Sequence, residues 1–278
     1  MRLGVTHSFC WRHDSETNPK EVADEAEEAV GRVSDSLEFD RWSGWIAPLK
    51  NAELRQRVFD AYCAAVPRAL HPCREILYVR DVTIDDLRRY KWALCLNFLP
   101  SPSESELENS SLISYRAEKE QRPGCSRQVL RRGTTKRIAP RVLQKHNGAV
   151  QLPNHDAFCT DDFATVLQQQ GMTGFHFTER NRTVLEMTPQ MHEFAADIQV
   201  CGRCGAALMD GFTTVFEHKH TYRYDLQAVS TEVGLEYVVS QRLVELLLKR
   251  NPKAYQDSMK LGALVPLFSE EPLRLMRS

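Results

Sequence analysis

The sequence lacks a long hydrophobic run and any marked excess of one charge. Its 278 residues include 36 Lys and Arg against 37 Asp and Glu. A chain this close to neutral is not steered as a whole toward nucleic acid or membrane. No run approaches the roughly 18 apolar residues of a membrane-spanning helix, and the opening MRLGVTHSFCWRHD is too short and polar for a secretory signal. We therefore expect a cytoplasmic protein.

The common catalytic motifs are also missing. The sequence contains no Gly-x-Ser-x-Gly, Walker-type Gly-Lys-Ser/Thr, Gly-x-Gly-x-x-Gly or His-Glu-x-x-His. A zinc deaminase would need His-x-Glu before Pro-Cys-x-x-Cys, but here His192-Glu193 has the wrong spacing and Val200 stands in place of the proline. Glu217, His218 and His220 are suited to acid–base chemistry, yet such groupings also arise by chance. A metal-dependent enzyme is therefore the third hypothesis, not the first.

Acidic and aromatic residues are both absent between Gln121 and His155, a segment with eight Lys and Arg. Such a segment is typical of a solvated loop and helix, and it can also bind phosphate or an acidic protein surface. Without aromatic residues, stacking on single-stranded bases is not supported. A zinc-containing nucleic-acid-binding or regulatory protein is therefore the second hypothesis.

Composition divides the chain into three parts. We expect an N-terminal helical and α+β region over 1–100, a linker and basic segment over 101–150, and a C-terminal α+β domain over 151–278. In the first part, PKEVADEAEEAVGRV predicts a solvated helix with a narrow apolar stripe of Val22, Ala26 and Val30. Thr83 followed by Asp86 resembles a capping box.

Two segments of the C-terminal part repeat one plan of a strand, a hydroxyl N-cap and an amphipathic helix. They are AFCTDDFATVLQQQGMTGFHF, capped by Thr160, and EYVVSQRLVELLLKRNPK, capped by Ser240. Gly171 is placed to end the first helix in a left-handed conformation. The sequence thus predicts an α+β fold with a mixed sheet, strand–helix units and a zinc-knuckle-like turn.

That turn is VCGRCGAALMDG at 200–211, which holds the one tight cysteine pair. Cys201 and Cys204 can supply two thiolates to a tetrahedral zinc ion. His218 and His220 are the nearest candidates for the other two ligands, because on a strand they would share one face. An aromatic sheet face with ordinary histidine hydrogen bonds is the alternative interpretation of those two residues.

Other interpretations of the pair stay open. Cys10 with His13, or His71 with Cys73, are further candidate ligands. The strand-like IQV before the pair and a helix beginning at AALM would instead suit a redox motif, and inert thiols are the third interpretation. In a reducing cytoplasm we expect the scattered cysteines to be small buried hydrophobes. They are Cys10, Cys63, Cys73, Cys95, Cys125 and Cys159.

Three features together resemble the double-CXXCG-motif family of bacterial, myxobacterial-type immunity proteins. They are CGRCG at 201–205, FCTDDFATVLQQQGMTGFHF at 158–177, and YVVSQRLVELLLKRNPK followed by GALVPLF. The resemblance spans about residues 150–268, and the family's first CXXCG is missing here. It implies a cytoplasmic, non-enzymatic protein that neutralises the cognate toxin of a polymorphic toxin system, with structural zinc as its cofactor if any is bound.

The leading hypothesis is accordingly a protein-binding protein whose partner is a toxin. If that toxin is a nuclease or another basic enzyme, the acidic stretch Glu21–Glu28 is the expected contact, because opposite charge raises the association rate. The carboxylates that we assign to it are Glu21, Glu25, Glu27 and Glu28.

We predict that Cys201→Ser releases zinc and unfolds the surrounding region. A structural zinc site contributes roughly 10–16 kcal/mol of apparent binding free energy, whereas a whole domain is stable by about 5–15 kcal/mol. Metal analysis and urea unfolding of the purified wild type and variant test this. Absence of zinc from the wild type, with a stability loss no larger than that of an ordinary core substitution, would contradict it.

Overall fold

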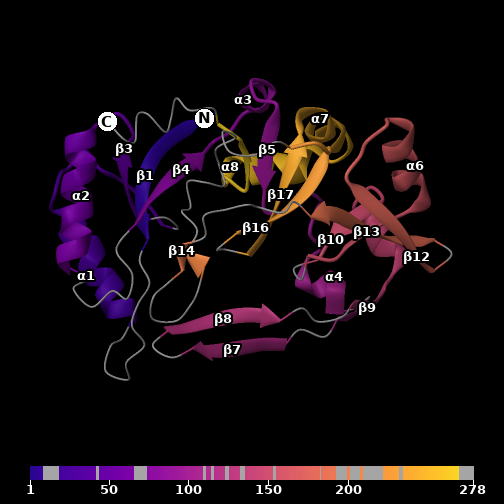
Figure 1. Ribbon diagram of the computed structural model, residues 1–278, viewed down its shortest axis with the longest axis horizontal. Coiled ribbons are helices and arrows are strands. Elements are labelled where there is room, and N and C mark those ends of the chain that lie inside the picture. The colour runs from indigo at the N-terminus through magenta and orange to yellow at the C-terminus, as the bar shows by residue number, and fades with distance from the viewer. Residues whose placement is uncertain are drawn as a thin grey trace.

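The computed structural model folds into two main sheets with helices packed on them (Figure 1). The fold is α+β, as the sequence predicted. No helix among the residues that the structure describes is long and apolar enough to span a membrane. The described residues are 1–8, 19–41, 44–65, 74–108, 111–113, 116–122, 125–131, 135–152, 155–181, 183–191, 199–200, 207–208, 222–231 and 234–268.

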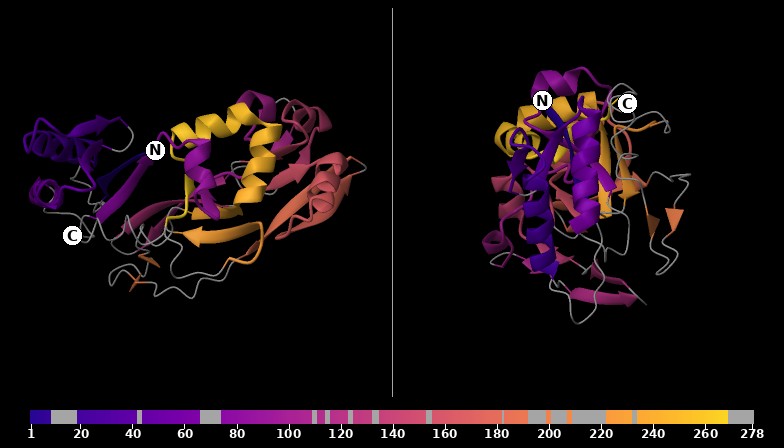
Figure 2. Two further views of the ribbon diagram at one scale, coloured as in Figure 1. Left: turned by 90° about the horizontal axis from the view of Figure 1, so that it is seen from above. Right: turned by 90° about the vertical axis from the view of Figure 1, so that its left-hand side faces the viewer.

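The first sheet is four-stranded, antiparallel throughout, and ordered β2-β3-β1-β4. Helices α1 and α2 lie side by side at one end of the molecule and pack on this sheet (Figures 1 and 2). Ala26 and Val30 of α1 are fully buried against α2 and β3, so the predicted apolar stripe is confirmed. The elements are β1 (Arg2–Ser8), α1 (Pro19–Gly31), β2 (Glu38–Asp40), β3 (Gly44–Pro48), α2 (Ala52–Ala65) and β4 (Arg74–Arg80).

The second sheet has eight strands in the order β10-β11-β13-β16-β17-β5-β18, with β12 paired to β13. All its pairings are antiparallel except β13 with β16. Residues 1–100 contribute strands to both sheets, because β5 lies between β17 and β18. The strands are β5 (Trp92–Cys95), β10 (Ala149–Gln151), β11 (Ala157–Cys159), β12 (Phe175–Asn181), β13 (Val184–Met191), β16 (Leu226–Thr231), β17 (Gly234–Ser240) and β18 (Leu264–Pro266).

Helices cover this second sheet, and α7 and α8 lie together on one of its faces (Figure 2). Cys95 and Cys159 are buried in this core, as expected for small hydrophobic thiols, whereas Cys63 on α2 is exposed. The helices are α3 (Ile84–Arg88), α4 (Glu104–Glu108), α5 (Pro140–Lys145), α6 (Asp161–Gln169), α7 (Gln241–Arg250) and α8 (Pro252–Lys260).

The basic segment, expected as loop and helix, contains strands as well as α5. Strand β7 (Arg116–Arg122) pairs with β8 (Cys125–Arg131), and β6 (Ser111–Ile113) pairs with β9 (Thr135–Ile138). Charge gives no signal of strand pairing, because the ladder joins backbone groups whatever the side chains are. The segment thus contains a helix, α5, as expected, and strands that were not expected.

The predicted helix caps are confirmed. The Thr160 hydroxyl accepts a hydrogen bond from the Phe163 amide, and the Ser240 hydroxyl accepts one from the Leu243 amide, both at 3.3 Å. Gly171 follows α6 with a φ of +60°, a left-handed conformation that glycine adopts without a Cβ penalty. Thr83 and Asp86 form the full capping box of α3.

One buried carboxylate ties the two strand–helix units together. Asp225 Oδ1 accepts from the Ser240 hydroxyl and from Arg242 Nε, each at 2.6 Å, and Oδ2 accepts from the amide and hydroxyl of Thr173 at 2.9 and 3.0 Å. Arg242 Nη2 also donates to the Gly171 carbonyl at 2.8 Å. Although burial acts to raise the pKa of Asp225, these donors hold it at about 2. These hydrogen bonds hold the turn after α6 and the start of α7 to the same residue, Asp225.

A buried histidine lies between β1 and α2. The His7 side chain is fully enclosed, and its ring lies 5.7 Å from the ring of Phe59 and 5.2 Å from that of Tyr62. Neither ring nitrogen has a hydrogen-bond partner in the part of the chain that the structure describes, and Glu75 Oε1 is 3.9 Å from Nε2. Burial, followed by the charge of Arg55, lowers the pKa of His7 to about 4.

We predict that acidification destabilises the protein through His7. Between its unfolded pKa of about 6.5 and its folded pKa of about 4, only the unfolded state takes up the proton. The free energy of unfolding should fall by up to ~3 kcal/mol across this range, as measured by urea unfolding. His7→Gln, which does not titrate, should flatten this part of the curve.

Glu75 makes the comparison with the variant necessary. Burial raises the pKa of Glu75, and such a shift adds stability as the pH falls, which opposes the effect of His7. The difference between the wild type and His7→Gln isolates the histidine. Parallel curves for the two proteins from pH 6.5 to 4 would overturn the assignment.

Candidate functional site

The acidic face of α1 consists of Glu21, Asp24, Glu25 and Glu28, all of them exposed. Positions three, four and seven residues apart lie on one side of a helix, and Ala26 and Val30 face the core from the opposite side. The helical period therefore brings these carboxylates together and turns them to solvent. Three of the four carboxylates predicted for partner binding (Glu21, Glu25 and Glu28) lie here, and Asp24 joins them.

Glu27, the fourth predicted residue, lies at the flank of the acidic face and is half-buried. Burial, and to a smaller extent the charge of Asp24, raises its pKa. Its backbone carbonyl accepts a hydrogen bond from Trp45 Nε1 at 2.7 Å, which ties α1 to β3. Glu28 forms an ion pair with Arg32 one turn along the helix.

An exposed aromatic residue lies next to this face. Phe39 on β2 is 48% exposed and contacts Trp45, with ring centroids 5.2 Å apart in an edge-to-face arrangement. The Trp45 ring in turn packs against Gly31, where an added Cβ would come within 2.9 Å of it. Phe39 is therefore linked through Trp45 to the C-terminal end of α1, whose first three turns carry the acidic face.

Carboxylates also flank Phe39 along its strand. Glu38 forms an ion pair with Arg2, and Asp40 accepts a hydrogen bond from the Tyr78 hydroxyl at 3.2 Å. These two side chains point to the face of the sheet opposite Phe39, because successive residues of a strand alternate between the two faces. A single exposed apolar side chain is ordinary, but aromatic residues are enriched among interface anchors. Phe39 was not predicted, and the one available signal was the aromatic residue between two acids in the short strand Glu38–Asp40.

The predicted metal ligands Cys201, Cys204, His218 and His220 lie outside the described residues, so zinc binding stays a prediction. The alternative ligands Cys10, His13, His71 and Cys73 lie outside them as well. Among the residues that are described, no three or more His, Cys, Asp or Glu side chains are grouped to hold a metal ion.

Two short strands bracket the CGRCG motif. Strand β14 (Gln199–Val200) precedes it and pairs with β15 (Ala207–Leu208), which follows it. The redox interpretation required a helix beginning at AALM, but Ala207 and Leu208 are in a strand. The cysteine pair itself lies outside the described residues, so the zinc-knuckle-like turn stays a prediction.

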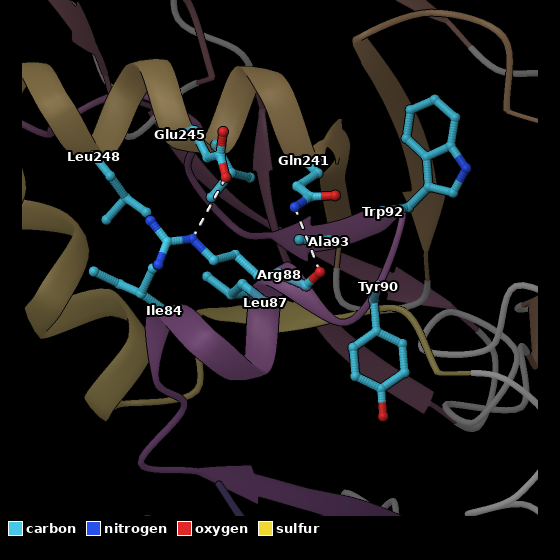
Figure 3. A pocket seen from close by; sticks show the side chains of 10 residues that line it. Ile84, Leu87, Arg88, Tyr90, Trp92, Ala93, Gln241, Glu245 and Leu248 are labelled. Atoms are coloured by element: carbon cyan, nitrogen blue, oxygen red, sulfur yellow. Dashed lines mark hydrogen bonds and ion pairs between the residues drawn. The ribbon is translucent and has the colours of Figure 1, made fainter.

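A small cleft between α3 and α7 is too narrow to hold a ligand (Figure 3). Arg88 lies across it, with its Nε 3.5 Å from Glu245 Oε1, and Gln241 Nε2 donates to the Arg88 carbonyl at 3.4 Å. Ile84, Leu87 and Leu248 supply its apolar part. The remaining space is about 10 Å³, which is on the scale of one water molecule.

No protein-family model, curated protein or solved structure matches the chain. Membership of the double-CXXCG-motif family therefore stays a prediction from the sequence.

Proposed function

We propose that the chain is a non-enzymatic, cytoplasmic protein-binding protein of the immunity type, which neutralises a basic toxin domain by binding it. The observation that carries this proposal is the acidic face of α1 together with the adjoining exposed ring of Phe39. The resemblance to the double-CXXCG-motif family supports the choice of a toxin as the partner.

The acidic face and Phe39 supply different parts of the recognition. Exposed carboxylates gathered on one helix face attract a basic surface from a distance, so they raise the association rate and make it depend on salt. A half-exposed aromatic ring has little long-range effect, but its burial at the centre of an interface slows dissociation. Together they fit a partner with a basic rim around an apolar pocket.

The first test is the combined substitution Glu25→Gln, Glu27→Gln and Glu28→Gln. We expect it to weaken binding to the cognate toxin at least tenfold at low salt, because attraction between exposed charges is strongest there. The dependence of log Kd on log salt concentration, from calorimetry or surface plasmon resonance, should also become shallower.

The matched control neutralises three exposed carboxylates elsewhere, with Asp161→Asn, Glu179→Gln and Asp257→Asn. It changes the net charge equally but leaves α1 intact, so it should retain nearly all of the affinity. The proposal fails if the α1 variant binds as tightly as the control and with the same salt dependence.

The second test is Phe39→Ala. We expect dissociation to become about tenfold faster or more, since truncation of an interface anchor costs roughly 2 kcal/mol of binding free energy. The free energy of unfolding should change little, because the ring is half-exposed. Leu261→Ala is the control, because Leu261 is 57% exposed but follows α8 near the second sheet. Equal dissociation rates for the two variants would contradict the role of Phe39.

A further inference from the structure

A hollow of about 410 Å³ lies where the start of β5, the N-terminus of α7 and the turn before β16 meet. Its volume falls in the range of small-molecule sites, roughly 300–1,000 Å³. The residues that matter for its chemistry are Lys91, Trp92, Arg223, Tyr224, Asp225 and Arg242. They lie on the second sheet and its helix, apart from the acidic face of α1.

The walls of the hollow are held in place by buried hydrogen bonds. The side-chain carbonyl of Gln227, a residue only 1% exposed, accepts from the amides of Arg223 and Tyr224 at 2.9 and 3.1 Å. The Ser240 amide donates to the Asp225 carbonyl at 2.8 Å, and the Gln241 amide donates to the Lys91 carbonyl at 3.0 Å. A site fixed in this way binds a ligand without first having to order its own backbone.

The hollow carries a surplus of positive charge. Lys91, Arg223 and Arg242 are all exposed, and Asp225 neutralises only Arg242, with which it is paired. Two cations, Lys91 and Arg223, remain. Two neighbouring cations favour an anionic group such as a phosphate.

The aromatic residues that line the hollow favour a ligand with a planar ring. Trp92 and Tyr222 are buried and pack edge to face with centroids 5.5 Å apart, which gives the hollow a rigid floor. Lys91 Nζ lies 5.5 Å from the centroid of the Trp92 ring, and Tyr224 is 41% exposed beside them. An exposed tyrosine ring next to cations provides a stacking surface for a planar base.

We propose that this hollow binds a nucleoside monophosphate, with its phosphate at Lys91 and Arg223 and its base on Tyr224. The site is separate from the proposed partner surface and does not depend on it. The whole chain should therefore bind the nucleotide in the absence of any protein partner.

Calorimetry with the full chain tests the proposal. AMP, GMP, CMP and UMP are titrated, with adenosine and inorganic phosphate as the two half-ligands. We expect at least one nucleotide to bind with a Kd on the order of 100 μM, and each half-ligand to bind at least tenfold more weakly. Phosphate that binds as tightly as the nucleotides would show an anion site without base recognition, and absence of nucleotide binding would show no site. Either result overturns the proposal.

Variants then locate the ligand. Lys91→Gln and Arg223→Gln should each weaken nucleotide binding about tenfold, and Tyr224→Leu should reduce nucleotide affinity toward that of phosphate. Lys249→Gln is the matched control, because this exposed lysine lies at the other end of α7. Circular dichroism confirms that each variant is folded. Nucleotide binding that survives all three substitutions, or falls equally in the control, places the ligand elsewhere and overturns the assignment.

Discussion

The C-terminal half of the protein depends on the buried carboxylate of Asp225. A buried charge is costly unless hydrogen bonds satisfy it, and donors from Thr173, Ser240 and Arg242 do so here. These residues come from the turn after α6, the N-cap of α7 and the first turn of α7. The requirement to satisfy one charge therefore sets how the two strand–helix units pack, and it also places Arg242 at the hollow beside α7.

The two sheets carry surfaces of opposite charge. The acidic face of α1 with Phe39 belongs to the first sheet, at one end of the molecule (Figure 1). The cationic hollow belongs to the second sheet and to α7. A near-neutral chain thus carries an acidic surface and a cationic hollow on different parts of the fold. The two proposed ligands, a basic protein and a small anion, would therefore contact different residues.

The sequence predicted those features that depend on neighbours along the chain. Thr160, Ser240 and the Thr83–Asp86 pair act within one helical turn, and the spacing of Glu21, Glu25 and Glu28 is enough to place them on one side of α1. Long-range pairing left no such signal. The insertion of β5 between β17 and β18 and the donors around Asp225 join residues far apart in the sequence. The pairing of β7 with β8 is local, and Pro123-Gly124 between the two strands was its available turn signal. Phe39 could not be recognised as part of a surface from the sequence, because its link to α1 runs through Trp45 and depends on the tertiary structure.

We propose that the acidic face of α1 and Phe39 form the surface that binds a basic toxin. Hydrogen–deuterium exchange of the full chain, with and without the cognate toxin, tests this proposal because the method maps protection along the backbone. We expect slower exchange in α1 and β2 on binding, with exchange in α7 and in the turn at Arg223 and Tyr224 unchanged. Protection confined to the β7–β8 hairpin or to the hollow, with α1 and β2 exchanging as in the free protein, would contradict it.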